Sequence, residues 1–257
     1  MKIFRSESFV DYSSYTFNYA TYCIKEDQRE IPEIYQNGFL PYSNDTDLEV
    51  ETYYLARSLR VELDHFNDSS ENRRVAKKIA DLKPGFSLIP VENFDINDEG
   101  FLDFCKDFAS RRFSEKISKE RLKYILKTES ITHIFEFTLD EKKVGYVIAI
   151  IENGTLHYWF AFFDLNFREY SLGKWLMYSV INWAAQNNLK YVYLGTCYGE
   201  KSLYKVRDFK SLSFFDGNRW NKDMKLLKQK CKSDDHFVCD VFKQDTDLFL
   251  KNLFSKK

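Results

Sequence analysis

The sequence predicts an α+β protein, in which a mixed, mainly antiparallel sheet is flanked by helices and preceded by a smaller N-terminal α/β subdomain. Asn153-Gly154 separates two β-rich runs, 144–151 and 155–163, which is a strong signal for a β-hairpin. Apolar residues then recur at helical spacing over 172–184, and a short apolar run follows at 191–195. Strands and helices that alternate in this order are typical of a mainly antiparallel sheet with helices on its faces.

Weaker signals mark the remaining elements. Gly38 ends a short helix, Ser69-Ser70-Glu71 starts a second one, and Ser114 is a candidate N-terminal cap of a later helix. Pro84-Gly85 and Pro90 punctuate a boundary, so we expect domains at 1–85 and 86–257. The other expected segments are extended stretches at 12–22, 52–60, 61–66, 86–91 and 132–138, and helices at 31–37, 70–79 and 101–108.

Composition favours a reduced, cytoplasmic protein. The 257 residues include five scattered cysteines without a CxxC pair, an odd number that does not suit a disulfide framework. The first residues lack the apolar block of a signal peptide, and no run approaches the roughly 18 apolar residues of a membrane span. We therefore expect no membrane partner.

The net charge of −1 argues against a general nucleic-acid binder, but the charge is unevenly distributed. Residues 1–56 carry ten acidic against four basic side chains, whereas residues 201–232 carry ten basic against three acidic ones. Further basic clusters lie at 73–78 and 106–127. Local positive surfaces suit a large anionic partner that docks on one face, although an ordinary solvated helix is the simpler explanation for any single cluster.

The segment Ser171-Leu172-Gly173-Lys174 opens the helix that follows the hairpin. A helix N-terminus presents unpaired N–H groups and a positive dipole end, which together favour a phosphate or another anion. Gly173 permits close approach of a phosphate, Ser171 caps the helix or donates to that phosphate, and Arg168 and Lys174 add charge. The simpler alternative is that Ser171 is an ordinary cap and Gly173 a packing glycine.

Several motifs in the second half of the chain point to one family: Phe162-Phe163-Asp164, Ser171-Leu172-Gly173, Tyr191-Val192-Tyr193-Leu194-Gly195, Tyr204-Lys205 with Phe209, and Asp216-Gly217-Asn218-Arg219-Trp220. They resemble the aminoacyl-tRNA–protein transferases of the N-degron pathway, both arginyl- and leucyl-transferring, which have a GNAT-like acyltransferase fold. The first half is similar more loosely, through Gly38-Phe39, Arg60-Val61 and Arg73-Arg74.

Two departures distinguish this chain from that family. The cysteine cluster that usually precedes Arg-Val is replaced here by 52–59, so any metal or redox role of the cluster is not expected. The segment 196–203 also differs from the family pattern, which bears on the acceptor pocket. A divergent subgroup is expected.

The resemblance implies transfer of Leu or Arg from aminoacyl-tRNA to the N-terminal α-amine of a protein, one that starts with Asp or Glu. An α-amine has a pKa of about 7.7–8.0, so alignment and oxyanion stabilisation can suffice without a strong base, a covalent nucleophile or a cofactor. We expect a monomer. The candidate catalytic residues are Tyr158 and Phe160 on the second hairpin arm, with Tyr204 and Lys205. The candidate substrate- and tRNA-binding residues are Arg73, Arg74, Arg168, Ser171, Leu172, Gly173, Lys174, Tyr193 and Gly195.

Two other functions stay open from the sequence. An acyl-CoA-dependent GNAT N-acetyltransferase would prefer a glycine where Ser171 stands, because a Cβ and a hydroxyl crowd a pyrophosphate. A tRNA-binding or adaptor module without turnover is the third hypothesis. Gly173→Val should abolish turnover under either enzymatic hypothesis without disturbing the fold. Neither a zinc site at Cys231, His236 and Cys239 nor a nucleophilic Cys197 is favoured, and the histidines at 65, 133 and 157 are expected in strands.

Overall fold

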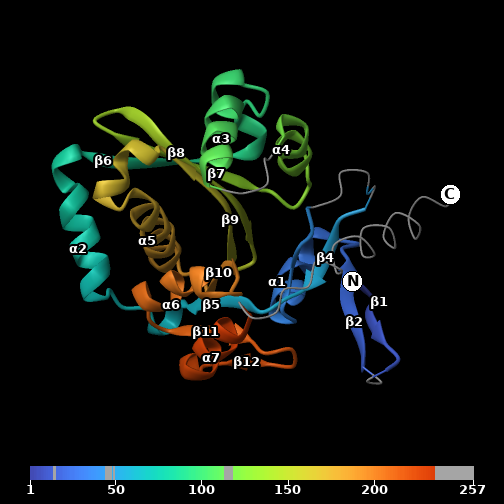
Figure 1. The fold of residues 1–257 in the computed structure, drawn as a ribbon. Coiled ribbons are helices and arrows are strands. Elements are labelled where there is room, and N and C mark those ends of the chain that lie inside the picture. Colours follow the sequence, from blue (N-terminus) through green and yellow to red (C-terminus); the bar gives the residue numbers. More distant parts are fainter. Residues whose placement is uncertain (14–15, 44–47, 49, 113–117, 235–257) are drawn as a thin grey trace. The chain divides into compact units, whose positions relative to one another are not determined.

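The computed structural model describes residues 1–13, 16–43, 48, 50–112 and 118–234, and it divides into two compact units (Figure 1). The first unit comprises Met1–Leu59, Thr196–Leu203 and Ser213–Lys257, and the second comprises Arg60–Gly195 and Tyr204–Leu212. Residue 85, the expected domain boundary, lies inside a strand of the second unit. The expected domains 1–85 and 86–257 therefore stay a prediction.

The first unit contains a four-stranded antiparallel sheet in the order β1-β2-β4-β3. Short strands were expected at 12–22; β2 lies largely in this region and forms a long hairpin with β1, which ends at Asp11. The helix α1 ends before Gly38, whose positive φ of 83° is one that glycine adopts without strain. The elements are β1 (Lys2–Asp11), β2 (Thr16–Ile24), η1 (Gln28–Glu30), α1 (Ile31–Gln36), β3 (Phe39–Pro41), β4 (Thr52–Leu55), η6 (Glu200–Leu203), β11 (Leu212–Phe215), β12 (Trp220–Asn221) and α7 (Met224–Asp234).

The second unit is built on a sheet in which the strands follow the order β5-β10-β9-β8-β7-β6. The pairs from β6 to β9 are antiparallel, while β9 and β10 are parallel. The mixed, mainly antiparallel sheet predicted from the sequence is therefore confirmed. The strands are β5 (Ser58–Glu62), β6 (Pro84–Pro90), β7 (His133–Leu139), β8 (Lys142–Glu152), β9 (Thr155–Phe163) and β10 (Tyr191–Thr196).

Helices cover both faces of this sheet (Figure 1). Phe135 and Phe137 of β7 meet Trp183 and Trp175 of α5 edge to face on one side. Tyr146 of β8 packs against α3 on the other. Because successive side chains of a strand point to opposite faces of a sheet, α5 and α3 each pack against their own set of strand residues. The helices are η2 (Leu63–His65), α2 (Ser70–Ile79), η3 (Ala80–Leu82), η4 (Val91–Asn93), α3 (Glu99–Arg112), α4 (Lys119–Leu126), η5 (Leu165–Tyr170), α5 (Leu172–Gln186) and α6 (Tyr204–Asp208).

Local signals determine several of these boundaries. Asn153 and Gly154 have φ values of 42° and 81°, which confirms the predicted tight turn of the β8–β9 hairpin. Ser69 caps α2, because its side chain accepts a hydrogen bond from the Asn72 amide. The predicted cap Ser114 lies outside the described residues, and α4 is capped instead by Ser118. The predicted extended run at 61–66 is wrong in part, because η2 occupies residues Leu63–His65.

Candidate active site

The strands β9 and β10 pair only at their beginnings. Thr155 lies opposite Tyr191, Leu156 opposite Val192 and His157 opposite Tyr193, and the pairing of these described strands then stops. Both strands nevertheless continue, β9 as far as Phe163. The backbone groups of β9 after His157 therefore do not pair with β10, although this part of β9 still pairs with β8 on its other edge.

A β-bulge in β9 lies just past this point. Tyr158 is opposite Ala149 and Phe160 is opposite Ile148, so Trp159 is the extra residue in the β9 strand. Such bulges bend a strand and re-aim its side chains, and they are over-represented next to active sites. Phe160 stacks on Phe162 at a centroid distance of 6.2 Å, so its ring belongs to an aromatic layer on that strand.

Lys205 links the start of α6 to the end of β10. Its Nζ donates a hydrogen bond of 2.6 Å to the carbonyl oxygen of Leu194. Gly195 follows with a positive φ of 77°, and a Cβ built there would lie 3.9 Å from the Lys205 Nζ. The ring centroid of the exposed Tyr204 lies 6.0 Å from that Nζ. The structure thus gathers Tyr204, Lys205 and Gly195, which the sequence selected from separate motifs.

Two buried side chains beside this group are held neutral. Burial, and then the phenol of Tyr204, raise the pKa of Tyr158 well above its ordinary value, so its hydroxyl stays a donor. Burial, and then the positive charge of Lys205, lower the pKa of His157 to about 3. At neutral pH, His157 is therefore an uncharged imidazole, and Lys205 carries the charge in this part of the site.

Arg60 is a buried cation that the sequence did not select as a site residue. Its Nη1 donates to the hydroxyl of Tyr193 at 3.4 Å, its guanidinium lies 4.0 Å from the ring centroid of Tyr191, and its Nη2 lies 3.3 Å from Glu62. Burial raises the pKa of Tyr193 to about 12 although Arg60 acts in the opposite direction. The Arg60-Val61 motif could have indicated this buried arginine, because a charged side chain inside an apolar strand needs buried polar partners.

A second group of predicted residues surrounds the start of α5. Ser171 adopts the left-handed conformation, with φ of 59° and ψ of 38°, and its side chain makes no capping hydrogen bond. The expected cap is therefore wrong; instead the Ser171 carbonyl accepts from the amides of Lys174 and Trp175. Leu172 is completely buried, so neither its side chain nor its backbone is exposed to a ligand in this structure.

Gly173 is required by packing. A Cβ built on this residue would lie 2.5 Å from Cζ of Phe163, closer than real Cβ contacts. The alternative of a packing glycine is thus supported. A valine side chain at position 173 would press on the Phe163 ring, and the expectation that Gly173→Val keeps an intact fold stays a prediction.

Lys174 is engaged by two carboxylates. Its Nζ lies 2.9 Å from Glu71 and 3.0 Å from the buried Asp208. Arg74 forms a bidentate pair with the same Glu71, with both distances at 2.8 Å, and the Arg74 and Lys174 hydrogen bonds lower the pKa of that carboxyl to about 2. These carboxylates offset the charges of Lys174 and Arg74, and the expected roles of Lys174 at a phosphate and of Arg74 at tRNA or an acidic acceptor residue stay predictions.

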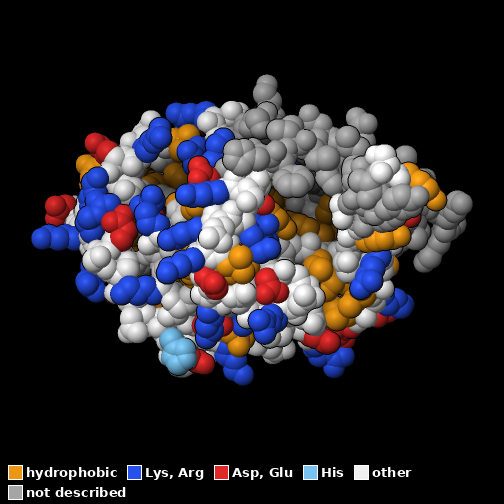
Figure 2. Space-filling model, turned by 60° about the horizontal axis from the view of Figure 1, so that its bottom comes forward, with side chains coloured by type: hydrophobic (Ala, Val, Ile, Leu, Met, Phe, Trp, Pro, Cys, Tyr) orange, Lys and Arg blue, Asp and Glu red, His pale blue; other side chains and the backbone are white. Residues whose placement is uncertain are grey.

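The outer side of α2 remains strongly basic. Arg73, Lys77 and Lys78 are exposed there, and Arg73 donates only to a backbone carbonyl, that of Asp68, at 3.0 Å. Lys78 donates to the backbone carbonyl of Glu169 in η5, which ties this helix to the segment before α5. Figure 2 shows Lys and Arg side chains gathering on the left, where Figure 1 draws α2. We name Arg73, Arg74, Lys77, Lys78 and the exposed Arg168 the α2 basic surface.

The turn before α5 does not fit the pyrophosphate of coenzyme A. The Phe163 ring leaves no room on the Cβ side of Gly173, and Lys174 is turned to Glu71 and Asp208. No step of a reaction is therefore derived through that cofactor.

The other candidate sites concern metal binding, Cys197 and the histidines. Within the described residues, no three His, Cys, Asp or Glu side chains are placed to hold a metal ion. His236 and Cys239 of the weighed zinc site lie outside the described residues. Cys197 is buried, as expected for a structural thiol, and His65 lies in η2 instead of a strand. None of the helices described is long and apolar enough to cross a membrane.

Comparison with known proteins relates this chain to acyltransferases. Residues 107–210 match the acetyltransferase (GNAT) domain family, and the observed α+β architecture agrees with the predicted GNAT-like fold. The chain is 26% identical to the aspartate/glutamate leucyltransferase of Saccharophagus degradans over 170 residues, which is 63% of this chain and 69% of that protein. These likenesses support an acyltransferase.

Solved structures are more distant. The chain is similar to L-PGS from Bacillus licheniformis with a TM-score of 0.46 and 13% identity, covering 82% of this chain and 72% of that one. It is similar to the C-terminal domain (DUF2156) of an Agrobacterium fabrum protein with a TM-score of 0.42 and 12% identity, covering 65% of this chain. The chain spans about half of that structure, 51% of its length.

Proposed function

We propose that this protein transfers an amino acid, Leu or Arg, from aminoacyl-tRNA to the N-terminal α-amine of a protein that starts with Asp or Glu. The observation that carries the proposal is the end of β9–β10 pairing after His157 and Tyr193, beside the Lys205 ammonium. The name of the Saccharophagus degradans relative supports leucine as the first donor to test. Such an enzyme needs neither metal nor cofactor, and we expect it to act in the cytoplasm as a monomer.

The chemistry requires alignment more than activation. The neutral amine attacks the ester carbonyl carbon, a C–N bond forms, and negative charge develops on the carbonyl oxygen. Backbone N–H groups of β9 near the Trp159 bulge, with the Lys205 charge close by, would stabilise that oxyanion. The C–O bond to the tRNA 3′ oxygen then breaks, and the proton lost by the amine ends on that oxygen.

Tyr158 and Tyr204 suit the leaving-group side of this reaction. The raised pKa of Tyr158 keeps its hydroxyl protonated, and the electrostatic influence of Tyr204 on that pKa supports proximity of the two phenols. A protonated phenol can give a hydrogen bond to the departing 3′ oxygen. Phe160 would contribute an apolar wall rather than a proton.

A transfer assay tests the proposal directly. Purified protein is incubated with radiolabelled Leu-tRNA or Arg-tRNA and with peptides that begin with Asp, Glu or Ala. Label that enters the Asp and Glu peptides, and that RNase abolishes, is the expected result. Lys205→Met should lower kcat/KM at least about 10-fold, whereas Tyr19→Phe, at an exposed tyrosine of β2, should leave it unchanged. Absence of label with both donors would contradict the proposal.

A second candidate is an acyl-CoA-dependent N-acetyltransferase, which the match of residues 107–210 to an acetyltransferase family favours. The crowded turn at Gly173 and the paired Lys174 weigh against it. Acetylation of the same peptides by acetyl-CoA, insensitive to RNase, would establish this candidate instead. Tight binding of tRNA without any product would favour a binding module that lacks turnover.

A further inference from the structure

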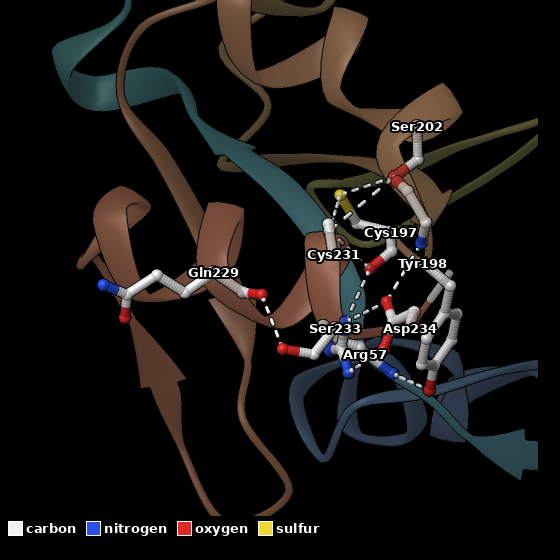
Figure 3. Close-up of polar contacts among 9 residues, drawn as sticks. Arg57, Cys197, Tyr198, Ser202, Gln229, Cys231, Ser233 and Asp234 are labelled. Carbon is white, nitrogen blue, oxygen red and sulfur yellow. Dashed lines mark hydrogen bonds and ion pairs between the residues drawn. The ribbon is translucent and has the colours of Figure 1, made fainter. Parts of the chain in front are cut away.

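Two cysteines of the first unit lie against each other. Cys197 and Cys231 are both completely buried, and their Sγ atoms are 3.8 Å apart (Figure 3). Cys197 belongs to the segment between β10 and η6, and Cys231 belongs to α7. The two cysteines are 34 positions apart in the chain, so only the fold brings their thiols together.

Polar contacts hold the two segments on either side of the sulfur atoms. The guanidinium of Arg57 pairs with Asp234 of α7 at 2.7 and 3.1 Å and donates to the Cys197 carbonyl at 3.4 Å. The amide of Gly199 donates to the same Asp234 at 2.9 Å. Arg57 and Asp234 thus clamp the Cys197 segment to the helix that carries Cys231, as Figure 3 shows.

The immediate surroundings of the thiols are also polar. The hydroxyl of Ser202 lies 3.2 Å from Cys197 Sγ and 3.9 Å from Cys231 Sγ, and Cys231 Sγ lies 3.5 Å from the Cys197 carbonyl oxygen. Cys105 is also buried, but it lies in α3 of the second unit.

We propose that Cys197 and Cys231 form a reversible intramolecular disulfide. A disulfide has an S–S distance of about 2.05 Å, so the sulfurs must approach by about 1.7 Å from their present separation. With a peroxide as oxidant, one thiolate attacks a peroxide oxygen, giving a sulfenic acid and water. The second thiol attacks the sulfenic sulfur and releases another water, so two thiols and one hydrogen peroxide yield one disulfide and two waters.

The bond would restrain the segment that precedes two candidate catalytic residues in the chain. The residues between Cys197 and Leu203 lead directly into Tyr204 and Lys205 at the start of α6. Oxidation would tie this segment covalently to α7, so transfer should slow when the disulfide forms and recover on reduction. This consequence for activity rests on the proposed function, whereas formation of the bond does not.

Peptide mapping tests the bond without any activity assay. The full-length protein is titrated with hydrogen peroxide, blocked with N-ethylmaleimide and digested with trypsin without reduction. Cleavage after lysine places Cys197 in peptide 191–201, Cys231 in peptide 231–232 and Cys239 in peptide 233–243, so each pairing has its own mass. We expect the 191–201 and 231–232 peptides to become linked and to separate with dithiothreitol. Peptides that carry only N-ethylmaleimide, or that link mainly through Cys239, would overturn the proposal.

Two variants sharpen the test. Cys231→Ser should abolish the link and leave Cys197 as a sulfenic acid that dimedone traps, while Cys105→Ser should change nothing. In the wild-type protein, oxidation should raise the Tm by several degrees, because the bond closes a long loop. The same link at equal yield in urea-unfolded protein would show that the folded arrangement does not direct it, which would also overturn the proposal.

Discussion

Asp208 is a buried carboxylate whose charge is offset by Lys174 at 3.0 Å and Arg207 at 2.9 Å. Because Lys174 also holds Glu71, its removal leaves two carboxylates short of a partner. Lys174→Met should therefore lower the free energy of unfolding by about 1–3 kcal/mol, the lower part of the range reflecting partial exposure of the lysine. Urea unfolding measures this loss. Lys77→Met, on the exposed side of α2, serves as the control and should change stability by less than about 0.5 kcal/mol.

His157 should make the stability of the folded protein depend on pH. Its pKa is about 3 in the folded protein against 6.5 ordinarily, so the unfolded chain binds the proton first as the pH falls. The stability it contributes is complete above about pH 6.5 and is lost towards pH 3, at about 1.4 kcal/mol per pH unit. His157→Gln should flatten that part of the stability curve. An unchanged slope in this variant would contradict the assignment.

The same histidine reports on Lys205. Since the Lys205 charge is the second cause of the low His157 pKa, Lys205→Met should raise that pKa towards its ordinary value. An NMR titration of the His157 imidazole measures the change, and His157→Gln assigns the signal. A pKa that stays the same would remove Lys205 from the immediate surroundings of His157, whatever happens to activity.

At the scale of elements, Ser69 and Ser118 form a matched pair of helix caps. Each accepts from the amide three residues later, at 3.0 and 3.1 Å, but Ser69 is buried and also donates to the Asp208 carbonyl at 3.0 Å. Ser118→Ala should cost about 1 kcal/mol, and Ser69→Ala about 1–3 kcal/mol, because it also leaves a buried carbonyl without that donor. Equal losses in urea unfolding would mean that the Asp208 contact contributes nothing.

A second prediction at the scale of elements concerns the contact between α5 and β9. Gly173→Ala places a methyl group against the Phe163 ring, which also packs on Phe108 at a centroid distance of 4.7 Å. The overpacking should cost about 1–3 kcal/mol. Phe163→Leu in the same chain should recover part of this loss, because the shorter side chain makes room. A double-mutant cycle in urea measures the coupling, and strictly additive effects would contradict the contact.

The elements themselves were largely predictable, whereas the partners of their side chains were not. Local sequence determines the Asn153-Gly154 turn and the apolar spacing of α5, so both were recovered. The sequence also predicted the start of α5 but not the left-handed conformation of Ser171. It led us to expect that Lys174 adds positive charge at this helix start. Glu71, which lies 103 positions away, neutralises the Lys174 ammonium. Such pairings depend on the tertiary fold, and single-sequence patterns carry no information about them.

At the scale of the molecule, the positive charge of α2 is the property that suits a large anionic partner. The net charge is only −1, yet α2 presents exposed Arg73 and Lys77 on consecutive turns of one helix. Among the described residues, no ion pair offsets these two cations, in contrast with Arg74 and Lys174. A polyanion such as tRNA releases counterions when it meets such side chains, so its binding depends on salt.

Neutralising that part of the α2 basic surface should therefore weaken tRNA binding in a salt-dependent way. The double variant Arg73→Gln, Lys77→Gln should lower affinity and make the slope of log Kd against log salt shallower by about 1–2, because each phosphate that is no longer neutralised removes about one unit. The matched control removes two lysines from exposed positions of α7, Lys225→Gln and Lys228→Gln, with the same change in net charge. Filter binding over a salt series measures both. If the two variants bind tRNA equally weakly, net charge rather than the α2 basic surface governs binding, and docking on this face is wrong.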